Sequence, residues 1–479
     1  MKNYIVFGLI FTVLLTFCKP GGGITGKTDY EPVSKVDSGR PVAVMLTSYS
    51  TTLLADGNDS TLLRICVTDS AGREISSAAN DIKIYLHGDA GIIKKGSRRP
   101  SVTAIDTGGF EYIADKLENG LAWYVFRSGE NPDKVKVEVR SGTLWPGSHE
   151  IHTISPDIEL LSPAQAIINT PYEPVHRMIG ADISFLPQFE ARGRKYYEDG
   201  QEKDVVKILS DHGFNYIRLR LFVNPENENG YSPGKGFCGL MHTLKMAQRV
   251  KDAGMKILLN FHYSDYWADP QQQNKPLAWA SLDFDALKDS VYHYTASVLQ
   301  AFDKQGTPVD MVQVGNEINH GLLWPDGHIS NPDQLAHLLI AGTEAVKSVN
   351  RKIPVMMHVA LGGQNQEAVF WFNNMLARGV KFDIMGISYY PRWHGTLNDL
   401  QYNLNDLVKR FGRPVNVVEY SNFREEVHEI VFSLPDDMGK GTCIWEPIGF
   451  RGRLFNRQGE MMEGMRLYDK LNNRYLSGN

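Results

Sequence analysis

The sequence predicts an α/β fold, a (β/α)8 TIM barrel preceded by a small Ig-like β-sandwich domain. From residue 178 onward, apolar segments of strand length alternate with segments whose apolar residues recur at helical spacing. Eight such strands fall within residues 178–476, or about 37 residues per strand, which suits the βα unit of a barrel. Residues 40–165 contain short strands separated by turn signals instead, as in a β-sandwich.

The predicted sandwich strands come first along the chain. Turn-forming pairs such as Asp56-Gly57 separate them, and they cover residues 42–46, 62–68, 82–87, 122–127 and 135–140. This segment is similar to bacterial Ig-like modules found beside glycosidase domains. Two roles are open for it: glycan binding through Trp123 or Trp145, or a rigid spacer whose core holds both tryptophans. We favour the spacer.

The barrel strands follow. They are nearly all apolar, as expected of parallel strands buried on both faces, and cover residues 178–182, 216–221, 256–261, 311–315, 354–359, 382–388, 415–419 and 441–446. Segments whose apolar residues recur at helical spacing lie between or after these strands. Examples are 244–253, 287–302, 335–349, 368–376, 400–411 and 465–476. A doubly wound open sheet is the main competitor. It is disfavoured because no glycine-rich phosphate-binding motif follows a strand.

The composition excludes several classes of protein. With 42% hydrophobic and 22% charged residues, the chain is neither disordered throughout nor a multi-span membrane protein. Fifty basic residues stand against 55 acidic ones, so no basic excess points to nucleic acid as a partner. The cysteine spacing shows no C-x-x-C pair, and the histidines form no H-E-x-x-H motif.

The N-terminus resembles a bacterial export signal. An uncharged run follows Lys2 and is too short to span a bilayer, and it ends in a lipobox-like sequence at Cys18. Phe17 departs from that pattern, because small residues are usual there. We therefore expect a signal peptide at 1–18 with lipidation of Cys18, a tether at 19–39, the sandwich at 40–165 and the catalytic domain at 166–479. The expected location is a membrane-anchored lipoprotein, at the cell surface or in the periplasm.

Two glutamates stand out at the ends of predicted barrel strands, where the active sites of such barrels lie. Glu317 follows the fourth strand and Glu419 ends the seventh, which places them across the mouth of the barrel from each other. Glycoside hydrolysis needs one protonated and one ionised carboxyl group. Close carboxylates do not both ionise cheaply, so their pKa values should be pushed apart.

Aromatic and polar residues share this rim. Tryptophan rings stack on the apolar faces of sugars, and we prefer that role over core filling for Trp267, Trp324, Trp393 and Trp445. Arg218 and Arg220 are candidate ion-pair partners for buried acids, and a cation near Glu419 would keep it ionised. For His262, His358 and His394 we favour contacts to sugar hydroxyls over metal binding, because close metal-ligand spacing is missing.

Several motifs together resemble those of glycoside hydrolase family 53, the arabinogalactan endo-β-1,4-galactanases. They are GADIS at 180–184, RLRLFVNP at 218–225, FHYSDYWADP at 261–270, QVGNEI at 313–318, GISYYPRWHG at 386–395 and WEP at 445–447. The stretch at 261–270 is the most specific to the family, whereas the Asn-Glu pair is shared by many (β/α)8 retaining hydrolases. The resemblance covers essentially all of residues 178–470.

The resemblance implies retaining endo-hydrolysis of β-1,4-galactan, the type I galactan of pectin, with Glu317 as acid/base and Glu419 as nucleophile. By matching motif, the sugar would be bound by Asp182, Arg220, His262, Asp265, Trp267, Asn316, Tyr390, Trp393, His394 and Trp445, with Asn316 on its 2-hydroxyl. We expect no cofactor, no metal and a monomer whose partners are the polysaccharide and, through the lipid, a membrane. The short segment 420–440 lacks the acidic ligands of a calcium-binding insertion. Another retaining β-glycanase of mannanase or xylanase type, or a non-catalytic glycan-binding lipoprotein, remain alternatives.

Overall fold

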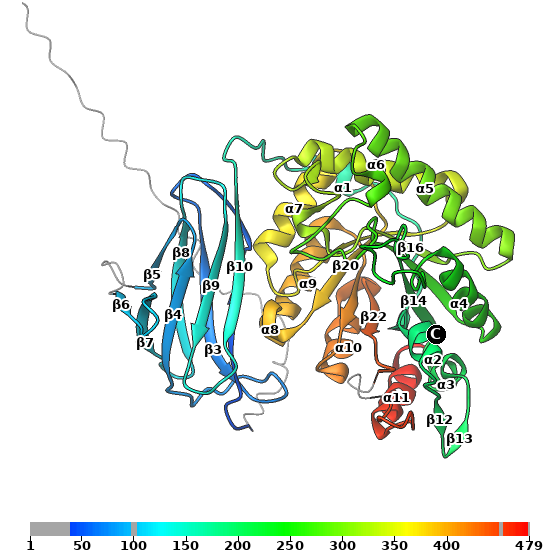
Figure 1. Ribbon diagram of the computed structural model, residues 1–479, viewed down its shortest axis with the longest axis horizontal. Coiled ribbons are helices and arrows are strands. Elements are labelled where there is room, and N and C mark those ends of the chain that lie inside the picture. Colours follow the sequence, from blue (N-terminus) through cyan, green and yellow to red (C-terminus); the bar gives the residue numbers. More distant parts are fainter. Residues whose placement is uncertain (1–38, 97–102, 450–453, 478–479) are drawn as a thin grey trace, which may run out of the picture. The chain divides into compact units, whose positions relative to one another are not determined.

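The computed structural model describes residues 39–96, 103–449 and 454–477 (Figure 1). The predicted signal peptide, Cys18 and nearly all of the predicted tether lie outside these residues. Among the described residues, no helix is both long enough and apolar enough to cross a membrane.

The N-terminal domain is a β-sandwich of two sheets. One sheet has the order β1-β3-β8-β5, and its strands are Ala43–Ser48, Ser60–Thr68, Leu121–Ser128 and Ala90–Lys94. The other has the order β2-β10-β9-β4-β7-β6, with strands Thr52–Leu54, Gly147–Ile154, Lys134–Arg140, Asp81–His87, Glu111–Lys116 and Thr103–Ile105. Alternate residues of these strands, such as Leu63, Ile65 and Val67 of β3, form the core between the sheets.

The second domain is a closed barrel of eight parallel strands in sequence order. They are β11 Met178–Asp182, β14 Tyr216–Leu221, β15 Lys256–Phe261, β16 Met311–Val314, β19 Val355–Val359, β20 Ile384–Tyr389, β21 Val415–Tyr420 and β22 Gly439–Trp445. An apolar layer near their N-terminal ends, including Met178, Tyr216 and Met311, fills the lower interior. The polar residues of the interior therefore gather toward the C-terminal ends.

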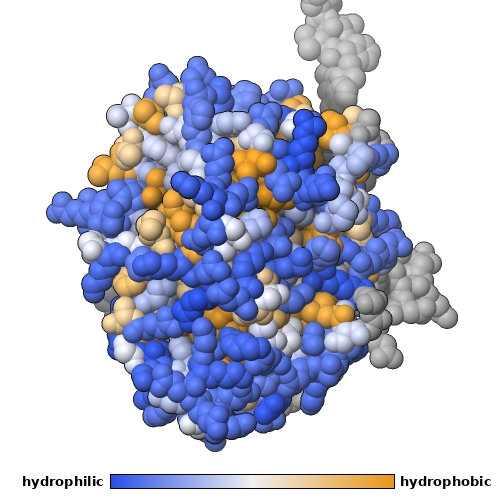
Figure 2. Space-filling view, turned by 90° about the vertical axis from the view of Figure 1, so that its right-hand side faces the viewer, coloured by the Kyte–Doolittle hydropathy of each residue, from blue (hydrophilic) through white to orange (hydrophobic). Residues whose placement is uncertain are grey.

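Helices surround this barrel (Figure 1). The longer ones are α3 Val205–Asp211, α4 Leu240–Asp252, α5 Phe284–Gln305, α6 Pro332–Val349, α7 Asn365–Ala377, α9 Leu397–Phe411, α10 Arg424–Phe432 and α11 Arg466–Tyr475. Shorter ones are α1 Gln165–Ile168, α2 Leu186–Ala191 and α8 Pro391–His394. Local sequence sets their ends: Thr396 and Asp399 form a capping box at the start of α9, and Gly306 ends α5 in the left-handed conformation. On the face that carries α4 and α5, hydrophobic side chains form small groups among hydrophilic ones (Figure 2).

The predicted fold class is confirmed, and three barrel strands begin and end where the sequence places them. Five strands of the sandwich, β2, β5, β6, β7 and β10, and the helices α1, α2, α3, α8 and α10 were not among the predicted elements. The expectation that both tryptophans lie in the sandwich core is wrong. Trp145 is 69% exposed, and Trp123 is only half-buried and lies outside the core cluster, because it alternates along β8 with the core residues Ala122 and Tyr124. The domain limits at 165 and 166 stay predictions; β10 ends at Ile154 and β11 begins at Met178.

Candidate active site

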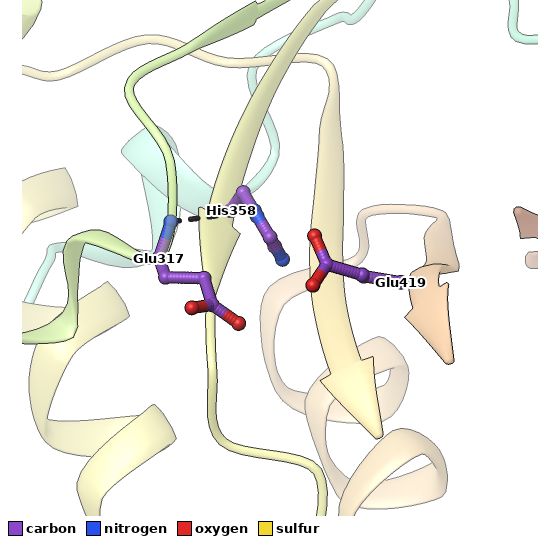
Figure 3. Close-up of side chains that lie close together, drawn as sticks. All are labelled: Glu317, His358 and Glu419. Carbon is purple, nitrogen blue, oxygen red and sulfur yellow. Dashed lines mark hydrogen bonds between the residues drawn. The ribbon is translucent and has the colours of Figure 1, made fainter. Parts of the chain in front are cut away.

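Two glutamates face each other at the C-terminal end of the barrel. Glu419 belongs to β21, whereas Glu317 follows β16 in a left-handed backbone conformation with φ of 50°. The carboxylate oxygens of both residues lie within 4.8 Å of each other and of a ring nitrogen of His358 (Figure 3). Non-glycine residues rarely adopt such a positive φ, and those that do are concentrated at functional sites.

The surroundings of Glu317 favour its protonated form. Burial and the neighbouring charge of Glu419 raise the pKa of Glu317 to about 8, although a hydrogen bond from Ser388 opposes them. Ser388 Oγ donates to Glu317 Oε1 over 2.6 Å and accepts from Nε2 of the buried His358 over 2.8 Å. His358 Nδ1 in turn accepts the backbone N–H of Glu317 at 3.3 Å. His358 thus supports Glu317 from behind and, being fully buried, does not reach a sugar.

A cation and a hydroxyl donor contact Glu419. Arg218 Nη1 lies 2.8 Å from Glu419 Oε2, and the hydroxyl of Tyr390 donates to Oε1 over 2.9 Å. Arg218 is 1% exposed, so its charge is little screened by water. The guanidinium and the hydroxyl therefore stabilise a negative charge on Glu419. In the described part of the chain, Glu317 has neither a guanidinium nor an ammonium group in hydrogen-bond contact.

Asn316 and Asp182 help to fix Arg218. Nη2 of Arg218 donates to Asn316 Oδ1 at 2.8 Å, and Nη1 lies 3.1 Å from Asp182 Oδ2. The amide of Asn316 also donates to the carbonyl of Ala268 at 2.8 Å. Asp182 is 1% exposed, so its contacts orient the buried arginine.

Arg220, two residues further along β14, lies in a different environment from Arg218. Its Nη2 pairs with Glu446 Oε1 at 3.1 Å, and its guanidinium carbon lies 4.2 Å from the centre of the Trp267 ring. Arg220 is 2% exposed, so it supports Trp267 from within the protein. Trp267 and Trp445 both meet Phe185 edge-on, so the three rings form one aromatic cluster.

The remaining predicted binding residues divide by exposure. Trp393 is 47% exposed, and its ring centre lies 5.7 Å from that of Tyr390, which leaves an aromatic face open to a ligand. Asp265, His262 and His394 are buried and engaged in local hydrogen bonds. Asp265 accepts the backbone N–H groups of Asn224 and Leu277, His262 Nδ1 accepts that of Ala268, and His394 Nδ1 accepts that of Tyr390.

The sequence named Arg218 and Arg220 as candidate ion-pair partners of buried acids, and the structure shows that Arg218 is the one that contacts Glu419. Sequence reasoning missed one contributor to the site, Ser388, which was not singled out. Its signal in the sequence is its place in the GISYYPRWHG motif at 386–395, and in the structure it is paired with Glu419 in the register of β20 and β21.

Glu317, His358 and Glu419 also form the group most able to hold a metal ion among the described residues. Both ring nitrogens of His358 are already engaged, with Ser388 and with the backbone of Glu317. A metal would have to break these contacts. The arrangement therefore fits a carboxylate pair supported by a histidine better than it fits a metal centre.

Comparison with known proteins agrees with this geometry. The family model of glycosyl hydrolase family 53 matches residues 178–426, a little over half of the chain. The chain belongs to this family. The model of glycoside hydrolase family 2 C-terminal domain 5 matches residues 44–150, consistent with the predicted Ig-like sandwich.

Individual known proteins match the part of the chain that forms the barrel. An uncharacterised protein of Niallia circulans is 38% identical over 312 residues, 56% of this chain and 83% of its own length. Arabinogalactan endo-beta-1,4-galactanase A of Aspergillus niger is 37% identical over 268 residues, 54% and 74% of the two chains. The GH53 catalytic domain of Ignisphaera aggregans aligns with a TM-score of 0.58 at 30% identity, over 65% of this chain and 99% of that domain.

Proposed function

We propose that this glycoside hydrolase cleaves β-1,4-galactosidic bonds within (arabino)galactan chains, with retention of anomeric configuration. The observation that carries the proposal is the carboxylate pair. The oxygens of Glu317 and Glu419 approach within 4.8 Å, the pKa of Glu317 is raised, and the guanidinium of Arg218 contacts Glu419. Retaining glycosidases hold their carboxyl groups about 5–5.5 Å apart, and inverting ones about 6.5–9.5 Å. The named relatives in this family supply the substrate class.

The reaction would proceed by two displacements. The Glu419 carboxylate attacks the anomeric carbon as Glu317 gives its proton to the departing glycosidic oxygen, and a glycosyl ester forms on Glu419. Glu317, now ionised, takes a proton from water, and the resulting hydroxide breaks the ester and regenerates Glu419. Arg218 and Tyr390 stabilise the negative charge on Glu419 before attack and after release.

The test is product analysis with purified protein on β-1,4-galactan, alongside mannan, xylan and cellulose. Short galacto-oligosaccharides are expected from galactan alone, and NMR of the first products should show the β-anomer. Glu317→Gln and Glu419→Gln should each lower kcat by orders of magnitude while the circular dichroism spectrum stays unchanged. Cleavage of another glycan in preference to galactan would replace the substrate, and binding without cleavage would indicate a glycan-binding protein.

We also propose export and lipid anchoring through Cys18, which the N-terminal sequence supports. The lipidated protein would act on polysaccharide outside the cytoplasm, as a monomer tethered by residues 19–39. Metabolic labelling with a palmitate analogue tests the anchor. Label is expected on the full chain and should be absent from a Cys18→Ser variant, and equal labelling of both would contradict the proposal.

A further inference from the structure

A cavity lies where the sandwich meets the barrel rim. It has a volume of about 480 Å³, within the 300–1,000 Å³ range of small-molecule sites. Its barrel side is lined by Tyr390, Trp393 and Trp445, and its sandwich side by β1 and the turn from Thr68 to Gly72. The cavity adjoins the reaction centre, because Tyr390 both lines it and donates to the carboxylate of Glu419.

The lining of the cavity suits a sugar. Trp393 is half-exposed and offers a flat apolar face, against which the C–H face of a pyranose can stack. Ser70 on the sandwich turn is exposed, and Ser421 and Asn422 on the barrel side add hydroxyl and amide groups that can bond to sugar hydroxyls. Carbohydrate sites combine these two features.

A second aromatic residue lies beside the sandwich wall of the cavity. The backbone of Trp145 pairs with β1, accepting from Val44 N at 2.8 Å and donating to Val42 O at 3.0 Å, and both partners line the cavity. The indole of Trp145 is 69% exposed. One exposed tryptophan needs no explanation by itself. Next to a cavity that opens from a glycosidase centre, it supplies a platform for a further sugar unit.

Buried polar contacts between the sandwich and the barrel hold the two walls of the cavity in fixed positions relative to each other. The carboxylate of Glu367 on α7 is 1% exposed and accepts from Thr51 Oγ1 at 2.6 Å and from Thr52 Oγ1 at 2.9 Å, both on the sandwich. On α8, Arg392 Nη2 donates to the carbonyl of Pro146 at 3.3 Å, directly after Trp145. A buried carboxylate is costly unless its bonds are made, so these contacts fix the sandwich against the barrel.

We propose that the sandwich domain forms one wall of an outer sugar-binding subsite, in which a galactan chain passes between Trp393 and the β1 edge and continues toward Trp145. This inference rests on the proposed galactanase function and deepens it. The sandwich is then part of the binding cleft and sets how many sugar units the enzyme recognises.

The test is subsite mapping with β-1,4-galacto-oligosaccharides of three to seven units on the full-length enzyme. Wild-type kcat/KM should rise with chain length as the outer subsite fills. Trp145→Ala removes the platform, and Ser70→Trp obstructs the cavity from an exposed turn. Each should lower kcat/KM for the longer chains relative to the trisaccharide by about tenfold, the effect of losing about 1.4 kcal/mol of binding.

Two variants of exposed sandwich residues outside the cavity lining are matched controls. Phe110→Ala removes an aromatic ring that is 59% exposed, and Thr107→Trp adds one at an exposed turn. Both should keep the wild-type dependence on chain length. If Ser70→Trp does not fold, as judged by circular dichroism, Trp145→Ala carries the test. A wild-type dependence in the Trp145 variant overturns the subsite while galactan cleavage stands, whereas a wild-type enzyme that cleaves no galacto-oligosaccharide overturns the proposed function as well.

Discussion

Removing the hydroxyl of Ser388 should move the alkaline limb of the pH–rate profile upward. Ser388 Oγ donates to Glu317 Oε1 over 2.6 Å, and this bond stabilises the ionised carboxylate. In Ser388→Ala the ionised form loses that donor, so the pKa of Glu317 rises further above its ordinary value and the acid stays protonated to higher pH.

The size of the shift follows from the bond. Hydrogen bonds to charged groups contribute about 1.5–3 kcal/mol, and one pKa unit corresponds to about 1.36 kcal/mol. A shift of about one pKa unit is expected, because water can replace part of the lost hydrogen bond.

The assay is kcat/KM on galactan from pH 5 to 10, where the alkaline limb reports the pKa of the acid in the free enzyme. Ser433→Ala, whose hydroxyl bonds within α10, is the control and should leave the limb in place. An alkaline limb that stays put or moves down in Ser388→Ala would refute the reasoning.

Three further predictions concern the charges of the fold. Arg218→Met should lower the melting temperature and remove most activity, because it removes the cation that contacts Glu419 and the nearer of the two cations of Asp182, at a cost of about 3–5 kcal/mol. Thermal melts at pH 7 and kcat measure the two effects, and a fully active variant would contradict the prediction. Tyr390→Phe should lower kcat with little change in stability, since it removes one donor to Glu419 and keeps the ring; paired assays of kcat and melting temperature decide this. Burial lowers the pKa of His149 to about 4, so this histidine is neutral in the folded protein. The free energy of unfolding should therefore fall as the pH drops from about 6.5 toward 4, by up to about 3 kcal/mol. Urea titrations at pH 7 and pH 5 measure this fall, which should be smaller in His149→Gln than in the wild type.

The barrel could be predicted from sequence because its strands are buried on both faces and give continuous apolar runs, as in β15. The sandwich was harder, because strands such as β7 are short and largely exposed and leave little pattern. Both glutamates could be placed from their positions after buried strands. The sequence could not decide whether Arg218 or Arg220 contacts Glu419. Both side chains point to the same side of β14, and they differ only in height along the barrel axis. That height determines which carboxylate each arginine contacts.

The acid and the nucleophile can be told apart from the position of one arginine. If Glu419 were the acid, it would have to carry its proton while 2.8 Å from Arg218, and the cation would disfavour that form. If Glu317 were the nucleophile, it would have to be ionised without an equivalent cation, beside a second carboxylate and largely out of water. Both reversed roles oppose the local field, and the assigned roles both follow it. The same asymmetry persists through the reaction. When Glu317 has lost its proton, Glu419 is bound as an ester, so the repulsion from Glu419, which together with burial had raised the pKa of Glu317, is gone. The pair therefore carries one net negative charge at each resting stage. The buried guanidinium of Arg218, which also pairs with Asp182, and the donors on Tyr390 and Ser388 stabilise that charge.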